Sequence, residues 1–369
     1  MKILICTGIF PPDVGGPATY SKILAEELVK HGHAVKVITY AGRIYPPSLE
    51  RRGTLGEADF ELIRIQRSRF KPLHYFRFYR TVLKHGRDVD VIYAQGPVSE
   101  GYPACLAAKK LNKPLAVKIT GDYSWEQAMG RGLTDELIDA FQNLSFYPPR
   151  IQRMRRIQKL VCDYANIIIT PSEYLKKVVS GWGVDPGKIR VIYNSVEMPE
   201  SIITNQESRQ KLGIPKDKFL IVSSGRNVPW KGFELLKEVM AELQKDHPEM
   251  MLKILHDAPR GLLHEYIRAA DLYVLNTGYE GLSNTLVEVL RHRIPVITTN
   301  VGGNPEIIRD GENGLLVEYN NIEQLKDAIL RLYSDKELRN KLRNSSGLEK
   351  FDLAQMISKT EEVLKQCAS

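Results

Sequence analysis

Short runs of apolar residues alternate along the chain with longer stretches in which apolar residues recur every three or four positions. The short runs have the length of buried strands, and the longer stretches have the period of helices with one apolar face. Strands that alternate with helices pair in parallel, so the pattern predicts a three-layer α/β fold. In the first half, the expected strands lie at 2–6, 34–40, 61–65, 89–93, 115–119, 166–170 and 189–193.

The same pattern begins again after a polar stretch at 200–210, which predicts a second α/β domain. We expect one domain over residues 1–198, a second over 199–348, and a final helical segment over 349–369 that has no strand beside it. In open parallel sheets, ligands bind beyond the carboxyl ends of the strands, and two facing sheets leave a cleft for a ligand. The expected strands of the second domain lie at 219–223, 251–255, 271–275, 294–298 and 314–317, with a helix at 233–245.

Positive charge is concentrated in one segment of a chain whose formal net charge is +8. From Arg64 to Arg87 the sequence has eight Lys or Arg residues, five Phe or Tyr residues and no carboxylate. Such a segment can lie on an anionic membrane surface, or it can be a solvated helix face whose aromatic residues enter the core. Binding to a polyanion is a third interpretation, but we expect no nucleic-acid partner.

The compartment is indicated by the cysteines and by the hydropathy of the chain. The four cysteines are scattered, without the spacing of a disulfide framework or a zinc site. The sequence contains no run of about 18 apolar residues, so it predicts no membrane span. The N-terminus resembles a first buried strand rather than a signal peptide. We therefore expect a cytoplasmic protein, at the inner face of the membrane if the basic segment contacts lipid.

Two loops of the first domain carry candidate site residues. Gly15 and Gly16 precede an expected helix, where glycines let backbone N–H groups approach an anion. An ordinary strand-to-helix turn is the alternative. Asp122 follows the strand at 115–119, where a carboxylate can act as a base or orient a substrate. The alternative is an aspartate that caps a turn.

A loop of the second domain carries two cations. Arg226 and Lys231 lie five positions apart, after the strand at 219–223 and before the helix at 233–245. A pyrophosphate is well matched by such a pair, because Arg is a bidentate donor and Lys is a point charge. The alternative is two solvated loop cations.

The segment from Glu280 to Glu288 is the most informative. It follows the strand at 271–275, and either Ser283 or Asn284 is a good N-cap residue, so a helix should begin there. The first amides of that helix are then free to bind phosphate. Glu280 lies in the loop just before, near whatever that phosphate carries, and Glu288 lies one turn into the helix, where it can accept hydrogen bonds from sugar hydroxyls. Two surface glutamates are the alternative. The expected phosphate-binding amides are those of Asn284, Thr285 and Leu286.

One sequence imitates a metal site. Asp88 and Asp90 form a D-x-D pair, but they precede a strand and so should lie at the edge of the sheet opposite to ligands. The histidines are also scattered, without ligand spacing. We therefore expect no metal ion and no cofactor.

Taken together, several segments resemble glycosyltransferase family 4, whose members have the GT-B fold of two Rossmann-like domains facing across a cleft. The resemblance extends over nearly the whole chain, and the segments are specific in combination. They are GGPATYS with ELVKHGHAVKVIT, IIITPSEYLKKVV with KIRVIYNSVE, GRNVPWKGFELL, EGLSNTLVE and PVITTNVGGNPEIIRDGENGLLVE.

The resemblance implies a retaining, metal-independent hexosyltransferase that takes its sugar from a UDP- or GDP-sugar. By matching positions, Arg226 and Lys231 would neutralise the departing diphosphate. Glu280 would hold the donor sugar and Glu288 the ribose, while Gly16 would approach the diphosphate. The last helix would return to the first domain. Fixed cations and a helix N-terminus can stabilise the charge that develops on a diphosphate leaving group, so no metal would be needed.

Two features depart from the family. A histidine often ends the strand corresponding to 115–119, whereas Thr120 lies here, and Asp122 can take its place. Only 15 residues separate the expected strands at 251–255 and 271–275. This length suffices for one helix, so the second sheet should be short of one strand.

Two other functions stay open. The protein can be a sugar-nucleotide epimerase or hydrolase of similar build, or a non-catalytic sugar-nucleotide-binding protein. The two loop cations and the helix with its two glutamates favour transfer. The acceptor is not identified by the sequence and can be lipid-linked or another glycan.

Overall fold

The computed structural model describes residues 1–369 except 14, 42–58, 197, 199–202 and 345–346. These residues divide into two compact units. Apart from the short segment Asp135–Ile138, the chain passes to the second unit after Tyr193 and back to the first after Leu353, compared with 198 and 348 from the sequence pattern. The first unit comprises Met1–Thr134, Asp139–Tyr193 and Ala354–Ser369, and the second comprises Asp135–Ile138 and Asn194–Leu353.

The first unit contains a seven-stranded sheet in the order β3-β2-β1-β4-β5-β6-β7. All its neighbouring strands are parallel. The apolar runs of the sequence explain this parallel sheet. Strands of a parallel sheet are buried on both faces and therefore offer few polar side chains to water. The strands are β1 (Lys2–Thr7), β2 (Ala34–Ala41), β3 (Glu61–Gln66), β4 (Val91–Ala94), β5 (Leu115–Lys118), β6 (Ile167–Thr170) and β7 (Ile189–Val191).

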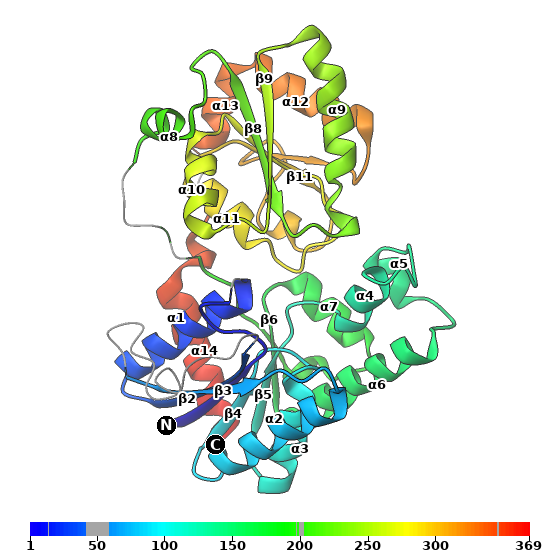
Figure 1. Ribbon diagram of the computed structural model, residues 1–369, viewed down its shortest axis with the longest axis vertical. Helices are drawn as coiled ribbons and strands as arrows, with labels where there is room; N and C mark the ends of the chain where they lie inside the picture. Colours follow the sequence, from blue (N-terminus) through cyan, green and yellow to red (C-terminus); the bar gives the residue numbers. More distant parts are fainter. Residues whose placement is uncertain (14, 42–58, 197, 199–202, 345–346) are drawn as a thin grey trace. The chain divides into compact units, whose positions relative to one another are not determined.

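Helices cover this sheet and complete its core (Figure 1). Phe78 and Val82 of α2, with Val161 of α6, pack on Leu4 and Ile92 of the strands. The helices of this unit are α1 (Gly16–Lys30), α2 (Lys71–His85), α3 (Gly101–Leu111), α4 (Tyr123–Met129), α5 (Ile138–Gln142), α6 (Pro149–Tyr164), α7 (Glu173–Gly181), the 3-10 turn η2 (Pro186–Lys188) and α14 (Leu353–Ala368).

The last helix, α14, returns to the first unit, as the resemblance implies. Apart from its first residue, Leu353, α14 belongs to that unit. In Figure 1, α14 lies beside α1. Glu361 of α14 accepts hydrogen bonds from His31 at 2.7 Å and His33 at 3.0 Å, just after α1. Its apolar side is buried, with Ile357 and Leu364 almost without exposure. The burial of that apolar side accounts for a helical pattern without a strand partner.

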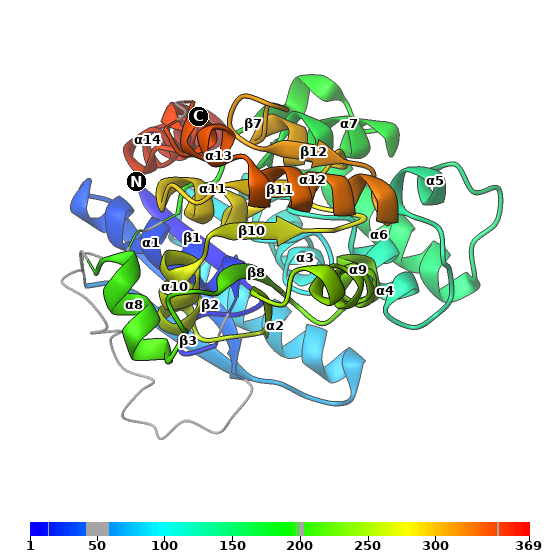
Figure 2. The ribbon, with the colours of Figure 1, turned by 90° about the horizontal axis from the view of Figure 1, so that it is seen from above.

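The second unit contains a five-stranded parallel sheet in the order β12-β11-β10-β8-β9. Figure 2 shows β12, β11, β10 and β8 side by side in this order. One helix, α10, links β9 to β10, so the sequence-based expectation of a shortened connection is confirmed. The strands are β8 (Phe219–Gly225), β9 (Met250–His256), β10 (Leu272–Leu275), β11 (Val296–Thr299) and β12 (Leu315–Val317).

The core of this unit lies between the sheet and the helices α9 and α12. Leu236 and Met240 of α9 and Ile329 of α12 pack against Val274 and Ile297. The helices are α8 (Asn205–Leu212), α9 (Phe233–Asp246), α10 (Arg260–Ala269), α11 (Asn284–Arg291), α12 (Ile322–Ser334) and α13 (Lys336–Arg343), with 3-10 turns η3 (Pro229–Lys231), η4 (Asn304–Glu306) and η5 (Glu349–Phe351).

Each sheet has one point where the strand order reverses. In the first sheet β1 pairs with both β2 and β4, and in the second β8 pairs with both β9 and β10. The loops beyond the carboxyl ends of such neighbouring strands diverge to opposite faces and leave a crevice in which ligands bind. Ligand sites are therefore expected at the loops after β8 and β10, and at the loops after β1 and β4.

All the strands expected from the sequence form, and their ends shift by at most two residues.

Candidate functional site

The loop after β8 is held against the loop after β10 by a glycine. Gly232 has a φ of 52° and begins α9 as its N-cap. A Cβ atom at this position would lie 2.5 Å from the backbone oxygen of Asn276. Only glycine therefore tolerates both the backbone angle and the close approach. This approach fixes the neighbouring Lys231 at the point where the strand order reverses.

Backbone hydrogen bonds join the same two loops. The N–H of Gly278 donates to the carbonyl oxygen of Trp230 at 2.7 Å, and the Thr277 hydroxyl donates to the same oxygen at 3.3 Å. Trp230 is buried. Buried backbone groups that are satisfied in this way hold a loop in one conformation.

These loops bring Lys231 and Glu280 together as an ion pair. The two side chains are only 11% and 14% exposed. The backbone of Glu280 packs closely against Gly302 and Gly303. A Cβ on Gly302 would lie 2.2 Å from the Glu280 carbonyl oxygen. The same oxygen accepts a hydrogen bond from Gly303 N–H at 2.9 Å. Two residues predicted separately from the sequence are thus placed in contact.

The helix α11 begins as the sequence predicts, with Ser283 as its N-cap. The Ser283 Oγ accepts a hydrogen bond from the Leu286 N–H at 3.4 Å. The expectation of three free amides is therefore wrong for Leu286, because a Ser N-cap occupies that donor. The amides of Asn284 and Thr285, as the first of the helix, have no intrahelical acceptor. They lie four and five positions after Glu280 and can bind an anion.

Glu288 is more buried than the sequence suggests. Its side chain is 2% exposed, and its Oε1 accepts a hydrogen bond from Arg260 Nη2 at 2.7 Å. Burial raises the pKa of Glu288 above its ordinary value, and Arg260 opposes that rise. A ribose that bonds to Glu288 must therefore share the carboxylate with Arg260. Arg260 was not among the residues predicted from the sequence, because a partner 28 positions away leaves no local signal.

Arg226 lies on the exposed part of the loop after β8. Its guanidinium lies 6.0 Å from the centre of the buried Trp230 ring, a distance at which cation–π attraction begins. Arg226 is thus held beside the residue that precedes Lys231, and its exposed side chain is accessible to a ligand. The structure thus groups Arg226, Lys231, Glu280, Asn284, Thr285 and Glu288 in the second unit.

Gly15 and Gly16 lie in the first unit, at the start of α1. Gly15 is the N-cap, with a φ of 155° that L side chains rarely adopt, and a Cβ there would lie 2.8 Å from Ile9 Cδ1. Gly16 is the first helical residue, followed by Pro17, which has no N–H. The glycines therefore let the chain enter the helix closely past Ile9, and the amide of Gly16 is directed outward from the helix start.

Asp122 is better explained as a structural cap than as a base. Its side chain has no exposure, and its Oδ1 accepts hydrogen bonds from Ser124 N–H at 2.9 Å and Gln158 Nε2 at 3.0 Å. Its Oδ2 accepts from Gln142 Nε2 at 2.8 Å. The carboxylate is thus engaged by donors of the protein itself, and without exposure it is closed to a substrate. The interpretation of Asp122 as an acceptor-side catalytic residue is therefore corrected to the N-cap of α4.

The D-x-D pair lies where the sequence places it, before β4. Asp90 accepts a hydrogen bond from the Lys2 N–H at 2.8 Å, and Asp88 forms an ion pair with Lys36 at 3.2 Å. Both carboxylates are therefore engaged at the amino edge of the sheet. Within the described residues, no group of three or more His, Cys, Asp or Glu side chains could hold a metal ion.

The basic segment forms β3 and α2, and its aromatic residues divide between two environments. Phe78 is buried in the core, whereas Phe70 and Phe76 are 67% and 54% exposed. Because His74, Phe78 and Val82 are four positions apart, they occupy the inner face of α2. The outer face carries Leu73, Phe76, Arg77, Arg80 and Lys84. Of the described helices, none has the length and apolarity needed to span a bilayer.

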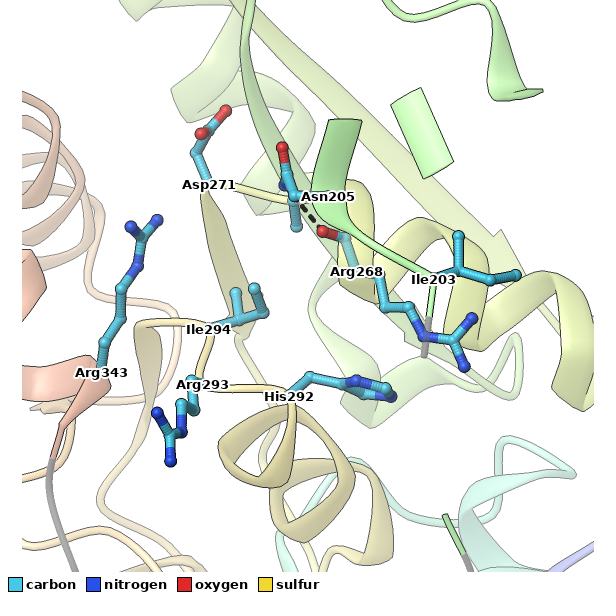
Figure 3. A pocket seen from close by; sticks show the side chains of 9 residues that line it. Ile203, Asn205, Arg268, Asp271, His292, Arg293, Ile294 and Arg343 are labelled. Atoms are coloured by element: carbon cyan, nitrogen blue, oxygen red, sulfur yellow. Dashed lines mark hydrogen bonds between the residues drawn. The ribbon is translucent and has the colours of Figure 1, made fainter. Parts of the chain in front are cut away.

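A cavity of about 540 Å³ in the second unit (Figure 3) lies away from the loops after β8 and β10. Asp271 and Ile294 line it just before β10 and β11, so it opens at the amino edge of the sheet. Arg268, Arg293 and Arg343 also line it, but Figure 3 shows their guanidinium groups on different sides without a common centre. Parallel sheets bind substrates at the other edge, so this cavity is not the donor site.

Sequence reasoning missed a buried carboxylate of the first unit, Glu100. It follows β4 at the reversal point of the first sheet and is 7% exposed. Burial raises its pKa from 4.5 to about 7. Perturbed carboxylates in pockets are typical of functional sites. Ligands bind beyond the carboxyl ends of parallel strands. Because Glu100 follows the expected strand at 89–93, the same reasoning could have identified it from the sequence.

Family models match both halves of the chain. Residues 14–198 match the model described as Glycosyltransferase Family 4. Residues 204–257 and 251–347 match the model described as Glycosyl transferases group 1. The two matches meet near the boundary between the structural units.

Two relatives illustrate the similarity in sequence. The lipopolysaccharide core biosynthesis glycosyltransferase LpsE of Rhizobium meliloti is 29% identical over 222 residues, which cover 54% of this chain and 61% of that protein. The chain thus spans less than two thirds of LpsE. The putative teichuronic acid biosynthesis glycosyltransferase TuaC of Bacillus subtilis is 25% identical over 370 residues, which cover 90% of this chain and 89% of that protein.

Solved structures share the fold over the full length. Sucrose-phosphate synthase of Thermosynechococcus elongatus has a TM-score of 0.76 at 17% identity and covers 99% of this chain and 98% of its own. HepE of Anabaena, solved in complex with UDP and glucose, has a TM-score of 0.74 at 16% identity and covers 99% of both chains. A putative UDP-N-acetylglucosamine 2-epimerase of Listeria monocytogenes has a TM-score of 0.62 at 15% identity and covers 99% of this chain and 96% of its own. At these identities the likeness establishes the fold alone.

Proposed function

Because the chain belongs to glycosyltransferase family 4, we propose that it transfers a sugar from a nucleotide-diphosphate sugar to a glycan or lipid-linked acceptor. The observation that carries the proposal is the ion pair between Lys231 and Glu280, which lies just before the N-terminus of α11. The pair combines a cation for a diphosphate with a carboxylate for sugar hydroxyls. The names of LpsE and TuaC support an acceptor that is a growing cell-surface polysaccharide.

In this proposal the second unit stabilises the leaving group. Breaking the bond between sugar and diphosphate develops negative charge on phosphate oxygens, and preorganised charges nearby lower the barrier. Lys231 and Arg226 supply two positive charges from one loop. The amides of Asn284 and Thr285 supply donors at the positive end of the α11 dipole.

The donor would exchange the partner of Lys231. Without donor, Glu280 neutralises Lys231 in a site with little exposure to water. A diphosphate that binds Lys231 attracts it more strongly than one carboxylate, because its charge is larger. Glu280 is then released to accept hydrogen bonds from the sugar. One ion pair thus keeps both groups satisfied until the substrate arrives.

We extend the proposal to the finer chemistry that the family resemblance implies. Transfer would retain the anomeric configuration. It would need no metal ion, since Lys231, Arg226 and the α11 N-terminus provide the positive charge. The donor would be a UDP- or GDP-sugar, and Glu288, shared with Arg260, would hold the ribose.

The outer face of α2 supports a membrane-proximal site of action at the cytoplasmic side. Phe70 and Phe76 are exposed beside Arg77, Arg80 and Lys84. Exposed aromatic residues among cations are typical of segments that lie in the interface of anionic bilayers. A peripheral position of this kind would bring the protein to a lipid-linked acceptor.

A donor assay tests the proposed function. The protein is incubated with UDP- and GDP-sugars, with and without a bacterial extract of lipids and glycans, and released nucleotide and sugar products are followed. Nucleotide release that depends on the extract is expected, together with retained configuration by proton NMR and full activity in EDTA. Conversion of the donor sugar without nucleotide release would indicate an epimerase, and donor binding without any turnover would indicate a non-catalytic binding protein.

A further inference from the structure

A pocket of about 320 Å³ lies at the reversal point of the first sheet. Gly8 and Ile9 line it after β1, and Gln95, Ser99 and Glu100 line it after β4. It therefore occupies the position in this sheet that the donor loops occupy in the second. Neither the family-derived site residues nor the corrected Asp122 lies in it. Its remaining lining residues are Pro17, Tyr40, Arg67, Lys71 and His74.

Two cations and a helix terminus contribute to the lining of the pocket. Lys71 is the first residue of α2, a helix of 15 residues whose N-terminus carries a positive partial charge. Among the described residues, Lys71 has no carboxylate within ion-pair distance. Arg67 donates a hydrogen bond to the Gly8 carbonyl oxygen at 3.2 Å and reaches Asp13 only at 4.0 Å. Arg67, Lys71 and the N-terminus of α2 therefore make the pocket suited to an anion.

His74 provides an independent sign of a ligand. It is 7% exposed and stacks on Tyr40 with ring centres 3.9 Å apart. Its Nδ1 is buried without a hydrogen-bond partner among the described residues. Burial, with Lys71 and Arg67 adding to the effect, lowers the pKa of His74 to about 4. A neutral imidazole with an unpaired buried nitrogen is costly unless something supplies its partner.

Glu100 belongs to the same lining and is built into the pocket. A Cβ on Gly96 would lie 2.6 Å from Glu100 Oε1, and a Cβ on Gly8 would lie 3.2 Å from Oε2. Two glycines thus leave the space that the carboxyl group fills. The same burial that raises its pKa makes Glu100 a strong hydrogen-bond partner for a hydroxyl group.

We propose that this pocket binds the acceptor and that the acceptor carries a phosphate group, held by Arg67 and Lys71 at the positive end of the α2 dipole, with a neighbouring hydroxyl on Glu100. A phosphate monoester, with about two negative charges at neutral pH, matches two cations better than a carboxylate does. The proposal rests on the proposed transferase function, since it names the acceptor class of that reaction. The phosphate can belong to a lipid headgroup or to a soluble sugar or polyol phosphate.

The first experiment measures phosphate binding to the full chain directly. The ring signals of His74, assigned by their loss in His74→Asn, are followed by NMR during titration with sn-glycerol 3-phosphate, and with glycerol as the uncharged match. A saturable shift with the phosphate and none with glycerol is expected. The double variant Arg67→Gln/Lys71→Gln should weaken binding by about tenfold or more, because each lost contact is charge-assisted.

Matched controls separate local from global effects. Lys109→Gln/Lys110→Gln removes two exposed charges of α3 outside the pocket and should leave the affinity for glycerol 3-phosphate within twofold. Unchanged signals of the other histidines show that each variant is folded. The proposal is overturned if wild type gives no saturable shift up to 50 mM, or if the pocket variant binds as tightly as wild type.

Vesicles decide between the two sources of phosphate. Phosphatidic acid and phosphatidylserine are compared in phosphatidylcholine vesicles of equal surface charge. A preference for phosphatidic acid that Arg67→Gln/Lys71→Gln abolishes assigns the pocket to a lipid phosphate, and equal binding assigns it to a soluble phosphate ester. Stabilisation of the same samples by UDP or GDP reports on the donor site. Phosphate binding without nucleotide binding would refute the transferase function and leave a phosphate site with no acceptor role. Nucleotide binding without phosphate binding would refute only the acceptor proposal.

Discussion

The ammonium group of Lys231 and the carboxylate of Glu280 form an ion pair across 49 positions of sequence, and both side chains are largely buried. A buried pair contributes little net stability, because desolvation of the two charges offsets their attraction. Its value here is positional. The pair holds a phosphate-binding cation and a sugar-binding carboxylate at the reversal point of the second sheet.

Lys231→Ala should lower kcat/KM for the donor by about 10²–10³-fold, the range measured when one preorganised group that stabilises transition-state charge is removed. The physical reason is the loss of a cation at the leaving diphosphate. Steady-state kinetics with the donor identified by nucleotide release measure the change. Lys237→Ala, which removes an exposed cation of α9 paired with Glu234, is the matched control. Equal kcat/KM in wild type and Lys231→Ala would exclude the role.

Glu100→Gln should stabilise the protein increasingly as the pH rises. Burial raises the pKa of Glu100 from 4.5 to about 7, so the folded state binds the proton more tightly than the unfolded state. The cost of ionising Glu100 is absent below pH 4.5, grows between the two pKa values and is complete above 7. The gain of the variant over wild type should therefore increase by about 3 kcal/mol from pH 4 to pH 8.

Urea denaturation across that pH range measures this gain. Glu238→Gln, at an exposed position of α9, controls for the loss of one carboxylate. A difference between Glu100→Gln and wild type that stays constant with pH would show that Glu100 ionises in the folded protein as it does in the unfolded chain.

Asp122→Asn should act on stability and not on catalysis. Its carboxylate caps α4 and accepts from Gln142 and Gln158, so the change weakens a cap worth about 1 kcal/mol and disturbs a buried network. We expect a lower melting temperature and a kcat/KM within threefold of wild type at a temperature where both are folded. A loss of 100-fold or more in a folded Asp122→Asn protein would restore the acceptor-side catalytic role.

Removal of the charges at Arg77, Arg80 and Lys84 should lower binding to anionic vesicles without unfolding the protein. Each basic residue near such a surface contributes about 1 kcal/mol, so the triple glutamine variant should bind at least tenfold more weakly. Vesicle co-sedimentation measures the effect. The control removes three exposed lysines of the second unit, Lys216, Lys245 and Lys336. If both variants bind as wild type does, α2 is only a solvated helix.

The sequence predicted the fold well because apolar runs and helical periods are local signals. The loops after β8 and β10 could be found by the same logic, since ligands gather at the carboxyl ends of parallel strands. The contact of Lys231 with Glu280 could not, because it depends on Gly232 and Gly302 bringing distant loops together. Such approaches are set by tertiary packing and leave no periodic trace.

The errors have equally specific causes. Asp122 looked catalytic because the sequence does not show the side chains of Gln142 and Gln158 that saturate it. The Leu286 amide looked free because the weak N-cap bond of Ser283 was not counted. Glu100 was passed over although it follows an expected strand. Its burial, for which Gly8 and Gly96 leave the space, is not visible in the sequence.

Calorimetric titration with UDP, GDP and ADP tests the central claim most directly, in wild type, Lys231→Ala and the control Lys237→Ala. One nucleoside diphosphate should bind wild type and the control equally and bind Lys231→Ala at least tenfold more weakly, because a charge-assisted contact to the diphosphate is lost. The absence of binding by every nucleotide, or equal binding by all three proteins, would contradict a nucleotide-sugar site built on Lys231 and Glu280.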